Sequence, residues 1–354
     1  VGLHGNYMEA QLDIFVGHIE ALQSKGDLYF PKGLFPAARK NAAIGYHRHD
    51  TTLFFSAISA FTLQKIGAEV GGALQMRIDR ICNGVIQNYP AFKNKDGLAT
   101  YNFWRTKPSD HFSNGYLFNR FEHFRIPDDV DDTAFVYLTT NPSEPEVQWL
   151  KEKLILHANG TNQWIRNTYP EYKQLKAYST WFGKNMYIEF DVCVMSNLMQ
   201  LVYQHDLPLN QHDFDSLEYI RAVIETKRYI LAPFRCAHQY PRTALIIYHV
   251  ARLIGDYDPA SLRDIKAQLI QDTQQILQSA KHPMDRLILS TSLLRLGVQP
   301  ARIDVSQYRP ADFEGFYFFI AGLLTAYENP ILYKISILPL FHMYWVSHAH
   351  CWTL

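Results

Sequence analysis

The sequence has few cysteines and no apolar run long enough to cross a membrane. Its four cysteines, Cys82, Cys193, Cys236 and Cys351, form no C-x-x-C pair. This spacing argues against a zinc ribbon or a disulfide framework and is typical of a reducing compartment. The longest apolar run, 316–327, is well short of the roughly 20 residues that a transmembrane helix needs. We expect a cytoplasmic protein without a transmembrane segment, with peripheral membrane attachment left open.

The sequence also lacks an excess of charge and the common nucleotide-binding motifs. Lysine and arginine number 34, and aspartate and glutamate also number 34, which gives no electrostatic reason to expect nucleic acid as a partner. No P-loop, dinucleotide-binding motif or Gly-x-Ser-x-Gly motif is present, and this disfavours nucleotide and hydride chemistry. We expect a small-molecule ligand. The oligomeric state stays open, as does a removed targeting segment, because the sequence begins at Val1.

Helical periodicity dominates the chain, and no strand pattern of any length stands out. The expected helices alternate between nearly all-apolar and amphipathic, which is typical of buried helices covered by outer partners. No flexible linker divides the sequence, so we predict one all-α domain over 1–354, an α/α toroid of about six helical hairpins, with an irregular helical bundle as the alternative. The expected helices lie at 8–26, 50–67, 73–89, 131–140, 144–160, 189–206, 213–230, 242–255, 259–280, 283–297, 313–329 and 335–352.

Polar residues begin several of the apolar helices, and long aromatic loops precede some of them. In a toroid the inner helices are parallel, so these helix starts would meet at one mouth, together with the loops 97–121 and 162–187. Loops of this length usually have a function. The alternative is that the acids only cap helices and favour the helix dipole. The helix-start residues are Asp50, Glu189, Asp191, Arg242 and Asp285.

The segment "PDDVDDTAFVYL", which begins at Pro127, places four carboxylates at the start of an apolar helix. Proline in the first turn and acids near a helix N-terminus are both favourable. Capping needs only one or two acids, whereas four repel one another. Capping alone therefore does not account for Asp128, Asp129, Asp131 and Asp132.

This segment resembles the DxDDTA motif of class II terpene cyclases of the squalene–hopene cyclase type. The resemblance covers about ten residues. The chain has no QW repeat, and it has room for one of that family's two helical domains. It implies an α/α barrel in which Asp131 protonates an alkene or epoxide of an isoprenoid, with Asp129 and Asp132 as neighbours. No metal is required for that step, and Mg²⁺ would enter only with a diphosphate substrate.

The crowding of the acids suits this chemistry. A helix N-terminus lowers a carboxyl pKa, whereas burial and neighbouring carboxylates raise it, and clustered acids titrate together. Aromatic walls would stabilise carbocations, although each aromatic residue could equally belong to the core. As substrate-binding residues we predict Asp128, Asp50, Trp104, Trp181, Tyr187, Asp191 and Arg242, with Tyr101, Phe103 and Trp164 as further candidate walls.

Other interpretations remain open. Asp128-Asp129-x-x-Asp132 also matches the DDxxD pattern by which class I terpene synthases hold magnesium, but no partner motif accompanies it. His47 with His49 and His348 with His350 could bind a metal, and Arg242 and Arg286 could bind phosphate or pair with acids; we predict no metal site. The alternative functions are a carbohydrate-active α/α barrel, either glycoside hydrolase or lyase, with acid and base from Asp131, Asp50, Glu189 or Asp191, and a non-catalytic ligand-binding toroid.

Overall fold

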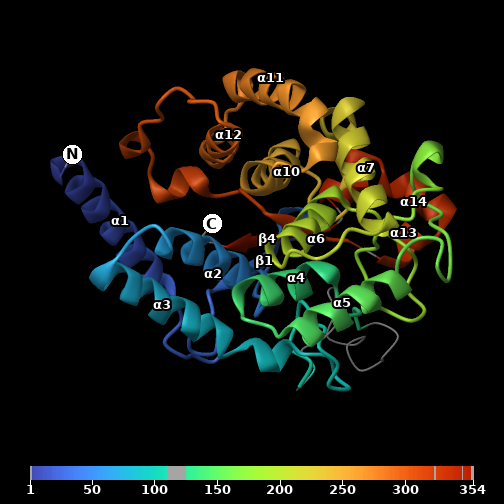
Figure 1. Ribbon diagram of the computed structural model, residues 1–354, viewed down its shortest axis with the longest axis horizontal. Coiled ribbons are helices and arrows are strands. Elements are labelled where there is room, and N and C mark those ends of the chain that lie inside the picture. The colour runs from blue at the N-terminus through green and yellow to red at the C-terminus, as the bar shows by residue number, and fades with distance from the viewer. Residues whose placement is uncertain (1, 108, 110–124, 323, 345, 352–354) are drawn as a thin grey trace. The chain divides into compact units, whose positions relative to one another are not determined.

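The computed structural model describes residues 2–107, 109, 125–322, 324–344 and 346–351, and it is largely helical (Figure 1). Helix makes up 57% and strand 7% of it, which confirms the all-α character. The described residues group into two compact units: unit 1 within 1–40, 45–150 and 350–354, and unit 2 within 41–44 and 151–349. The expectation of one domain stays a prediction, and each unit is considered by itself.

The elements follow one another along the chain as short helices joined by turns. The α-helices are α1 (Gly2–Leu22), α2 (Phe54–Gly67), α3 (Gly72–Ile86), α4 (Val130–Thr139), α5 (Glu144–Leu156), α6 (Val192–Gln204), α7 (Gln211–Glu225), α8 (Arg228–Leu231), α9 (Pro233–Cys236), α10 (Thr243–Tyr257), α11 (Arg263–Ser279), α12 (Pro283–Arg295), α13 (Leu324–Glu328) and α14 (Pro330–Ser336). Short 3₁₀ turns lie at Ala42–Ile44, Tyr89–Phe92, Pro170–Tyr172, Ala260–Leu262, Val305–Gln307 and Pro310–Phe313, and a π-helix at Leu340–Tyr344.

In unit 1, α2 is the central helix. It packs against both α3 and α4, and α1 packs against α3. Every residue of α4 is buried, and the ring of Phe135 on α4 meets Phe54 and Phe61 of α2 edge-on, with centroids 5.6 and 5.7 Å apart. By contrast, α3 buries one stripe, Leu74, Ile78, Ile81, Cys82 and Val85, with the three- and four-residue spacing of an amphipathic helix.

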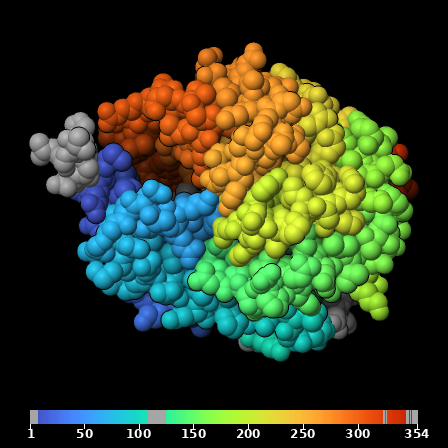
Figure 2. All heavy atoms as spheres, viewed as in Figure 1, coloured from blue at the N-terminus to red at the C-terminus, as the bar shows by residue number. Residues whose placement is uncertain are grey.

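In unit 2, α10 is the central helix, as α2 is in unit 1. It packs between α6 and α12, while α7 contacts both α6 and α11. The enclosed helix α6 buries every residue from Val192 to Val202, whereas α11 buries only Ile265, Leu269, Asp272 and Thr273. The side chains of α7 and α11 form a continuous outer surface, yellow and orange in Figure 2. The predicted contrast between enclosed and covering helices is therefore present.

The enclosed helices start side by side within each unit. In unit 1, the N–H of Leu53 donates to the carbonyl of Phe103 at 3.0 Å and the N–H of Asp129 donates to that of Tyr101 at 3.1 Å, so the segment 101–103 joins the starts of α2 and α4. In unit 2, the N–H of Gln239 donates to Asp191 Oδ2 at 3.1 Å, which joins the starts of α6 and α10. The closed ring of a toroid stays a prediction.

Four short strands correct the expectation that no strand is present. The strands β1 (Ala37–Asn41) and β2 (Tyr46–His49) are neighbours. The strands β3 (Phe319–Ala321) and β4 (Ser347–Cys351) pair antiparallel, with Ile320 opposite His348. Two predicted helices were therefore wrong: 313–329 contains β3 and the short α13, and 335–352 contains α14's last turn, the π-helix and β4. No helix among the described residues is both long and apolar enough to cross a bilayer.

Close backbone contact in unit 1 predicts the effect of adding one methyl group. Gly33 has a φ of +100°, and a Cβ there would lie 2.2 Å from the carbonyl oxygen of Gly84 on α3. Gly33→Ala should lower the free energy of unfolding by roughly 3 kcal/mol, because it adds a backbone clash to an unfavourable φ.

Gly97→Ala is the matched control, because Gly97 has a similar φ of +89° and nothing within 4 Å of its would-be Cβ. It should lose only about 1 kcal/mol, the effect of φ alone. Denaturant unfolding of both variants measures the difference. Equal losses at the two positions would contradict the close packing of Gly33 against Gly84.

Candidate functional site

The start of α4 brings the four predicted carboxyls together out of water. Asp128, Asp129, Asp131 and Asp132 are 8%, 5%, 5% and 2% exposed. They lie at the N-terminus of a wholly buried helix, where backbone N–H groups and the helix dipole favour negative charge. Burial opposes that charge, so the hydrogen-bond donors available to each carboxyl decide its protonation.

Asp128 accepts hydrogen bonds from three side chains. Its Oδ2 accepts hydrogen bonds from Asn94 Nδ2 at 2.5 Å and Thr100 Oγ1 at 2.6 Å, and its Oδ1 accepts one from Asn102 Nδ2 at 3.3 Å. All three donors come from the segment 94–102, which also pairs with Asp129. Asp128 therefore holds this segment against the start of α4, and its oxygens are already engaged.

Asp129 is the N-cap of α4. Its Oδ1 accepts the backbone N–H of Asp132 at 2.7 Å, and its carbonyl accepts the Thr133 hydroxyl at 2.7 Å. Burial raises the pKa of the Asp129 carboxyl to about 8, and the charge of Asp131 adds to the effect of burial, although hydrogen bonds from Asp132 oppose it. A cap that stays partly protonated near neutral pH is unusual.

Asp132 has the poorest supply of donors. Its Oδ1 is buried and has no hydrogen-bond partner among the described residues. Burial raises its pKa well above the usual value, and the charge of Asp129 and a hydrogen bond to the Asp129 carboxyl raise it further. We expect Asp129 and Asp132, here called the acid pair, to titrate together and to share a proton at neutral pH.

Asp131, the acid that the resemblance implies, lies in the first turn of α4 beside the acid pair. Its negative charge contributes to the raised pKa of both Asp129 and Asp132. The sequence thus predicted the cluster, whereas the structure adds the hydrogen-bond donors of its members and the direction of the pKa shift of the acid pair.

Asp50 belongs to a separate ion-pair cluster in unit 1. Its Oδ2 lies 2.7 Å from Arg39 Nη2 in a buried salt bridge, and its Oδ1 accepts the indole N–H of Trp104 at 2.9 Å. The Arg39 guanidinium lies 4.5 Å from the Trp104 ring centre. The proposed capping role of Asp50 was wrong, because Leu53 is the N-cap of α2. Asp50 and Trp104 instead fix the segment that leads to the acids. The rest of that loop, at 108 and 110–121, lies outside the described residues.

Unit 2 contains a second buried carboxylate with an imidazole. Glu189 Oε2 accepts the Tyr187 hydroxyl at 3.0 Å and lies 3.4 Å from His238 Nδ1, while Oε1 accepts Gln239 Nε2 at 3.1 Å. Nε2 of His238 is 2.8 Å from the Tyr333 hydroxyl. Although burial raises the pKa of Glu189, the hydrogen bond and charge of His238 bring it below the usual value, so Glu189 stays ionised.

Sequence reasoning found Glu189 and Tyr187 and missed His238 and Tyr333. No local spacing indicates that pair, because the two residues are 95 positions apart. The Tyr327 hydroxyl is also buried in this region, without a partner among the described residues. His238 Nε2 and the Tyr333 hydroxyl are within hydrogen-bond distance, whereas His238 Nδ1 has no hydrogen-bond partner among the described residues, so no continuous proton path runs to Glu189.

The remaining predicted residues of unit 2 are mainly structural. Asp191 is the N-cap of α6, with Oδ1 accepting the N–H of Cys193 at 2.9 Å. Arg242 binds Asp285 with Nη2 at 2.6 and 2.7 Å from its two oxygens, as the ion-pair alternative predicted. Trp181 is 7% exposed, and its indole N–H has no partner among the described residues.

One histidine of each predicted pair packs against an aromatic ring. His49 lies on β2 with its ring centre 4.3 Å from that of Tyr29, and His348 stacks on Tyr317 at 4.2 Å. Within the ranges that the structure describes, no three or more His, Cys, Asp or Glu side chains form a group that could hold a metal ion. Trp164, another candidate wall, is 47% exposed.

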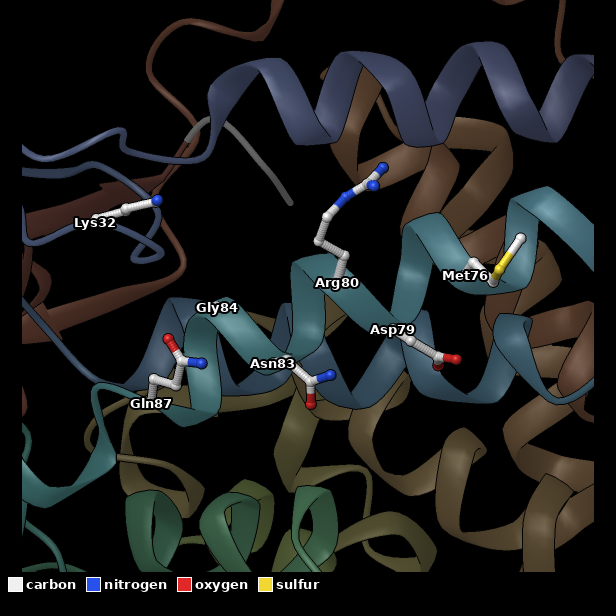
Figure 3. A pocket seen from close by; sticks show the side chains of 7 residues that line it. All are labelled: Lys32, Met76, Asp79, Arg80, Asn83, Gly84 and Gln87. Atoms are coloured by element: carbon white, nitrogen blue, oxygen red, sulfur yellow. The ribbon is translucent and has the colours of Figure 1, made fainter.

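A surface pocket of about 450 Å³ lies in unit 1 away from the acids. Lys32 and residues of α3 line it, and Figure 3 shows Arg80 projecting from α3 on a different side from Asp79 and Asn83. Arg80 also pairs with Glu20 at 3.3 Å. The diverging polar groups do not converge on one ligand position, so we assign the pocket no chemistry.

The acid pair predicts a pH dependence of stability. Because the pKa of both carboxyls is raised on folding, to about 8 for Asp129, the folded state binds more protons than the unfolded chain between about pH 4 and pH 8. The stabilisation is fully present below about pH 4 and is lost as the pH rises through this interval. The unfolding free energy should fall by at least about 1.4 kcal/mol, the equivalent of one pKa unit.

Asp132→Asn removes the shared proton and should flatten this dependence in denaturant unfolding at a series of pH values. Asp304→Asn is the control. Asp304 is an exposed N-cap whose pKa is lowered by hydrogen bonds from Ser306, so it titrates below the interval. A variant at Asp132 with the wild-type slope would contradict the shared proton.

Comparisons with known proteins identify no family for this chain. No family model matches the chain, and no match to a curated protein or a solved structure was found. The chemistry of the described residues and the short resemblance of the acidic motif are therefore the basis on which we infer a function.

Proposed function

We propose that this protein is an acid-initiated enzyme that protonates an alkene of an isoprenoid substrate at the start of α4. The observation that carries the proposal is the acid pair, in which the pKa of Asp129 is raised to about 8 and that of Asp132 is raised well above its usual value. Strongly perturbed carboxyls are typical of groups that transfer protons. An ordinary surface or capping aspartate would be ionised and could not donate.

Asp132 is the proposed proton donor. When its O–H gives up the proton, the electron pair stays on the carboxylate and the alkene becomes a carbocation. The two opposite charges then stabilise each other strongly, because little water separates them. The resemblance places the donor at Asp131 instead, and separate Asn variants at 131 and 132 distinguish these assignments.

The surroundings favour an apolar substrate. The acids lie on a helix with no exposed residue, next to the packed rings of Phe54 and Phe135. Phe103 and Trp104, whose ring centres are 5.0 Å apart, lie in the segment that pairs with the start of α2. Aromatic rings stabilise carbocations by cation–π attraction. The acid step itself requires no metal, and Mg²⁺ would be needed only to bind a diphosphate tail.

The carbohydrate alternative has less support at this site. Glycoside hydrolysis uses two carboxyls about 5–10 Å apart, with one acid and one base or nucleophile. Asp129 and Asp132 instead lie within one helical turn, and the backbone N–H of Asp132 donates to Asp129 Oδ1. A cytoplasmic location and a single toroid remain parts of the proposal.

A product assay tests the proposed function. Purified protein is offered farnesyl diphosphate, geranylgeranyl diphosphate and squalene, each with and without Mg²⁺, and products are identified by mass spectrometry. We expect a cyclic product whose formation falls at least about a hundredfold in Asp132→Asn, the usual contribution of a general acid.

Asp304→Asn, an exposed cap in unit 2, should retain wild-type turnover. A product that keeps its diphosphate would support protonation rather than diphosphate ionisation as the first step. Loss of activity only in Asp131→Asn would move the donor to the position that the resemblance implies. Unchanged products in both variants, or no turnover of any of the three substrates, would contradict the proposal.

A further inference from the structure

Asp128 lies just outside the part of the acidic segment that carries the resemblance. The motif DxDDTA spans 129–134, and Asp128 directly precedes it. Its buried side chain accepts hydrogen bonds from Asn94, Thr100 and Asn102. These donors replace the water that a buried carboxylate loses, so the segment that supplies them also fixes the position of the carboxylate.

Asn102 connects Asp128 to the aromatic residues that follow. Its Nδ2 donates to Asp128 Oδ1 at 3.3 Å and to the Ile126 carbonyl at 2.9 Å, and its Oδ1 accepts the backbone N–H of Trp104 at 3.0 Å. Only one orientation of the amide makes all three contacts, because its nitrogen donates and its oxygen accepts. Asp128 therefore acts through Asn102 on the backbone that carries Phe103 and Trp104.

The same segment is attached to the start of α4 by its backbone. The N–H of Asp129 donates to the Tyr101 carbonyl at 3.1 Å, and the N–H of Tyr101 donates to the Thr133 hydroxyl oxygen at 2.9 Å. The Thr133 hydroxyl in turn donates to the Asp129 carbonyl at 2.7 Å. These contacts set the position of Tyr101 relative to the acid pair, and the three donors to Asp128 hold the residues on either side of it.

The charge of Asp128 also acts on the acid pair. Burial is the largest cause of the raised pKa of Asp129 and of Asp132, and the charges of Asp131 and Asp128 add to it. Tyr89 faces Asp132 as well: burial raises the pKa of Tyr89, and the charge of Asp132 is a further cause. Because like charges favour the protonated form of a carboxyl, removing the charge of Asp128 should lower the pKa of the acid pair.

We propose that Asp128 is a positioning residue for the acid step, which fixes the segment 94–104 beside the acid pair and places a negative charge next to the two carboxyls. This inference rests on the proposed function and adds to it a residue that lies outside the resemblance. The two parts of the role respond differently to pH. Loss of a contact loosens the segment at every pH, whereas loss of the charge changes the protonation of the acid pair.

Denaturant unfolding of the full chain at about pH 4 and about pH 9 tests the charge without any substrate. In the wild type the unfolding constant should rise with pH, because the folded state loses the protons that its raised pKa values retain. Asp128→Asn keeps the size of the side chain and removes its charge, so this rise should be about tenfold smaller, the equivalent of one pKa unit. Thr100→Val removes one donor and keeps the charge, so it should destabilise the fold equally at both pH values.

Asp96→Asn is the matched control, because Asp96 lies in the same segment with its side chain 70% exposed; it should show the wild-type rise. Asp128→Ser, whose hydroxyl can still accept a hydrogen bond, serves if circular dichroism shows that Asp128→Asn does not fold. A wild-type rise in the Asp128 variant, or an equal reduction in Thr100→Val, would overturn this inference alone. A wild-type chain without the rise would contradict the acid pair, and with it the proposed function as well.

Turnover of whichever of farnesyl diphosphate, geranylgeranyl diphosphate or squalene the wild type converts provides a second readout. If the pKa of about 8 at Asp129 falls by one unit, the protonated fraction drops about fivefold at pH 8 and little at pH 6. The loss of kcat in Asp128→Asn should therefore be about fivefold greater at pH 8 than at pH 6, whereas the loss in Thr100→Val should be the same at both. Equal losses at the two pH values in Asp128→Asn would leave it a structural role only and overturn the inference.

Discussion

The start of α4 keeps four carboxyls out of water, and hydrogen-bond donors reach Asp128, Asp129 and Asp132 unequally. A buried carboxylate is stable only where N–H and O–H groups replace the water that it loses. Asn94, Thr100 and Asn102 donate to Asp128. Asp129 receives a backbone N–H, and Asp132 Oδ1 receives nothing among the described residues. We expect this unequal supply to leave a proton on the acid pair, and the proposed chemistry depends on that proton.

The surrounding fold keeps water away from these carboxyls. All of α4 is enclosed in unit 1, so the helix dipole can favour charge at its N-terminus but water cannot. The segment 94–104 is held in place on two sides, by Asp128 and by the contact of Trp104 with Asp50. Unit 2 also buries a carboxyl, but with more polar neighbours. Glu189 accepts hydrogen bonds from Tyr187 and Gln239 and lies beside His238, and its lowered pKa favours the ionised form.

Helical periodicity was enough to locate most of the helices, because their buried residues recur every three or four positions, as in α3. It failed at 313–329 and 335–352, where apolar residues predominate and no period distinguishes strand from helix. The acidic motif was evident from its crowding, but the location of the proton was not. That depends on donors such as Asn94, which is 34 positions from Asp128. The contacts of His238 with Tyr333 and of Arg39 with Asp50 likewise arise only from tertiary packing.

The central claim is that the acid pair holds a proton at neutral pH. Infrared difference spectroscopy of protein labelled with ¹³C at the aspartate carboxyls tests it directly, because a protonated carboxyl and a carboxylate absorb in separate regions. We predict a protonated-carboxyl band at pH 7 that is lost in Asp132→Asn and that weakens in the wild type as the pH rises. A spectrum with only carboxylate bands at pH 7 would contradict the claim, and the proposed proton donor would be lost with it.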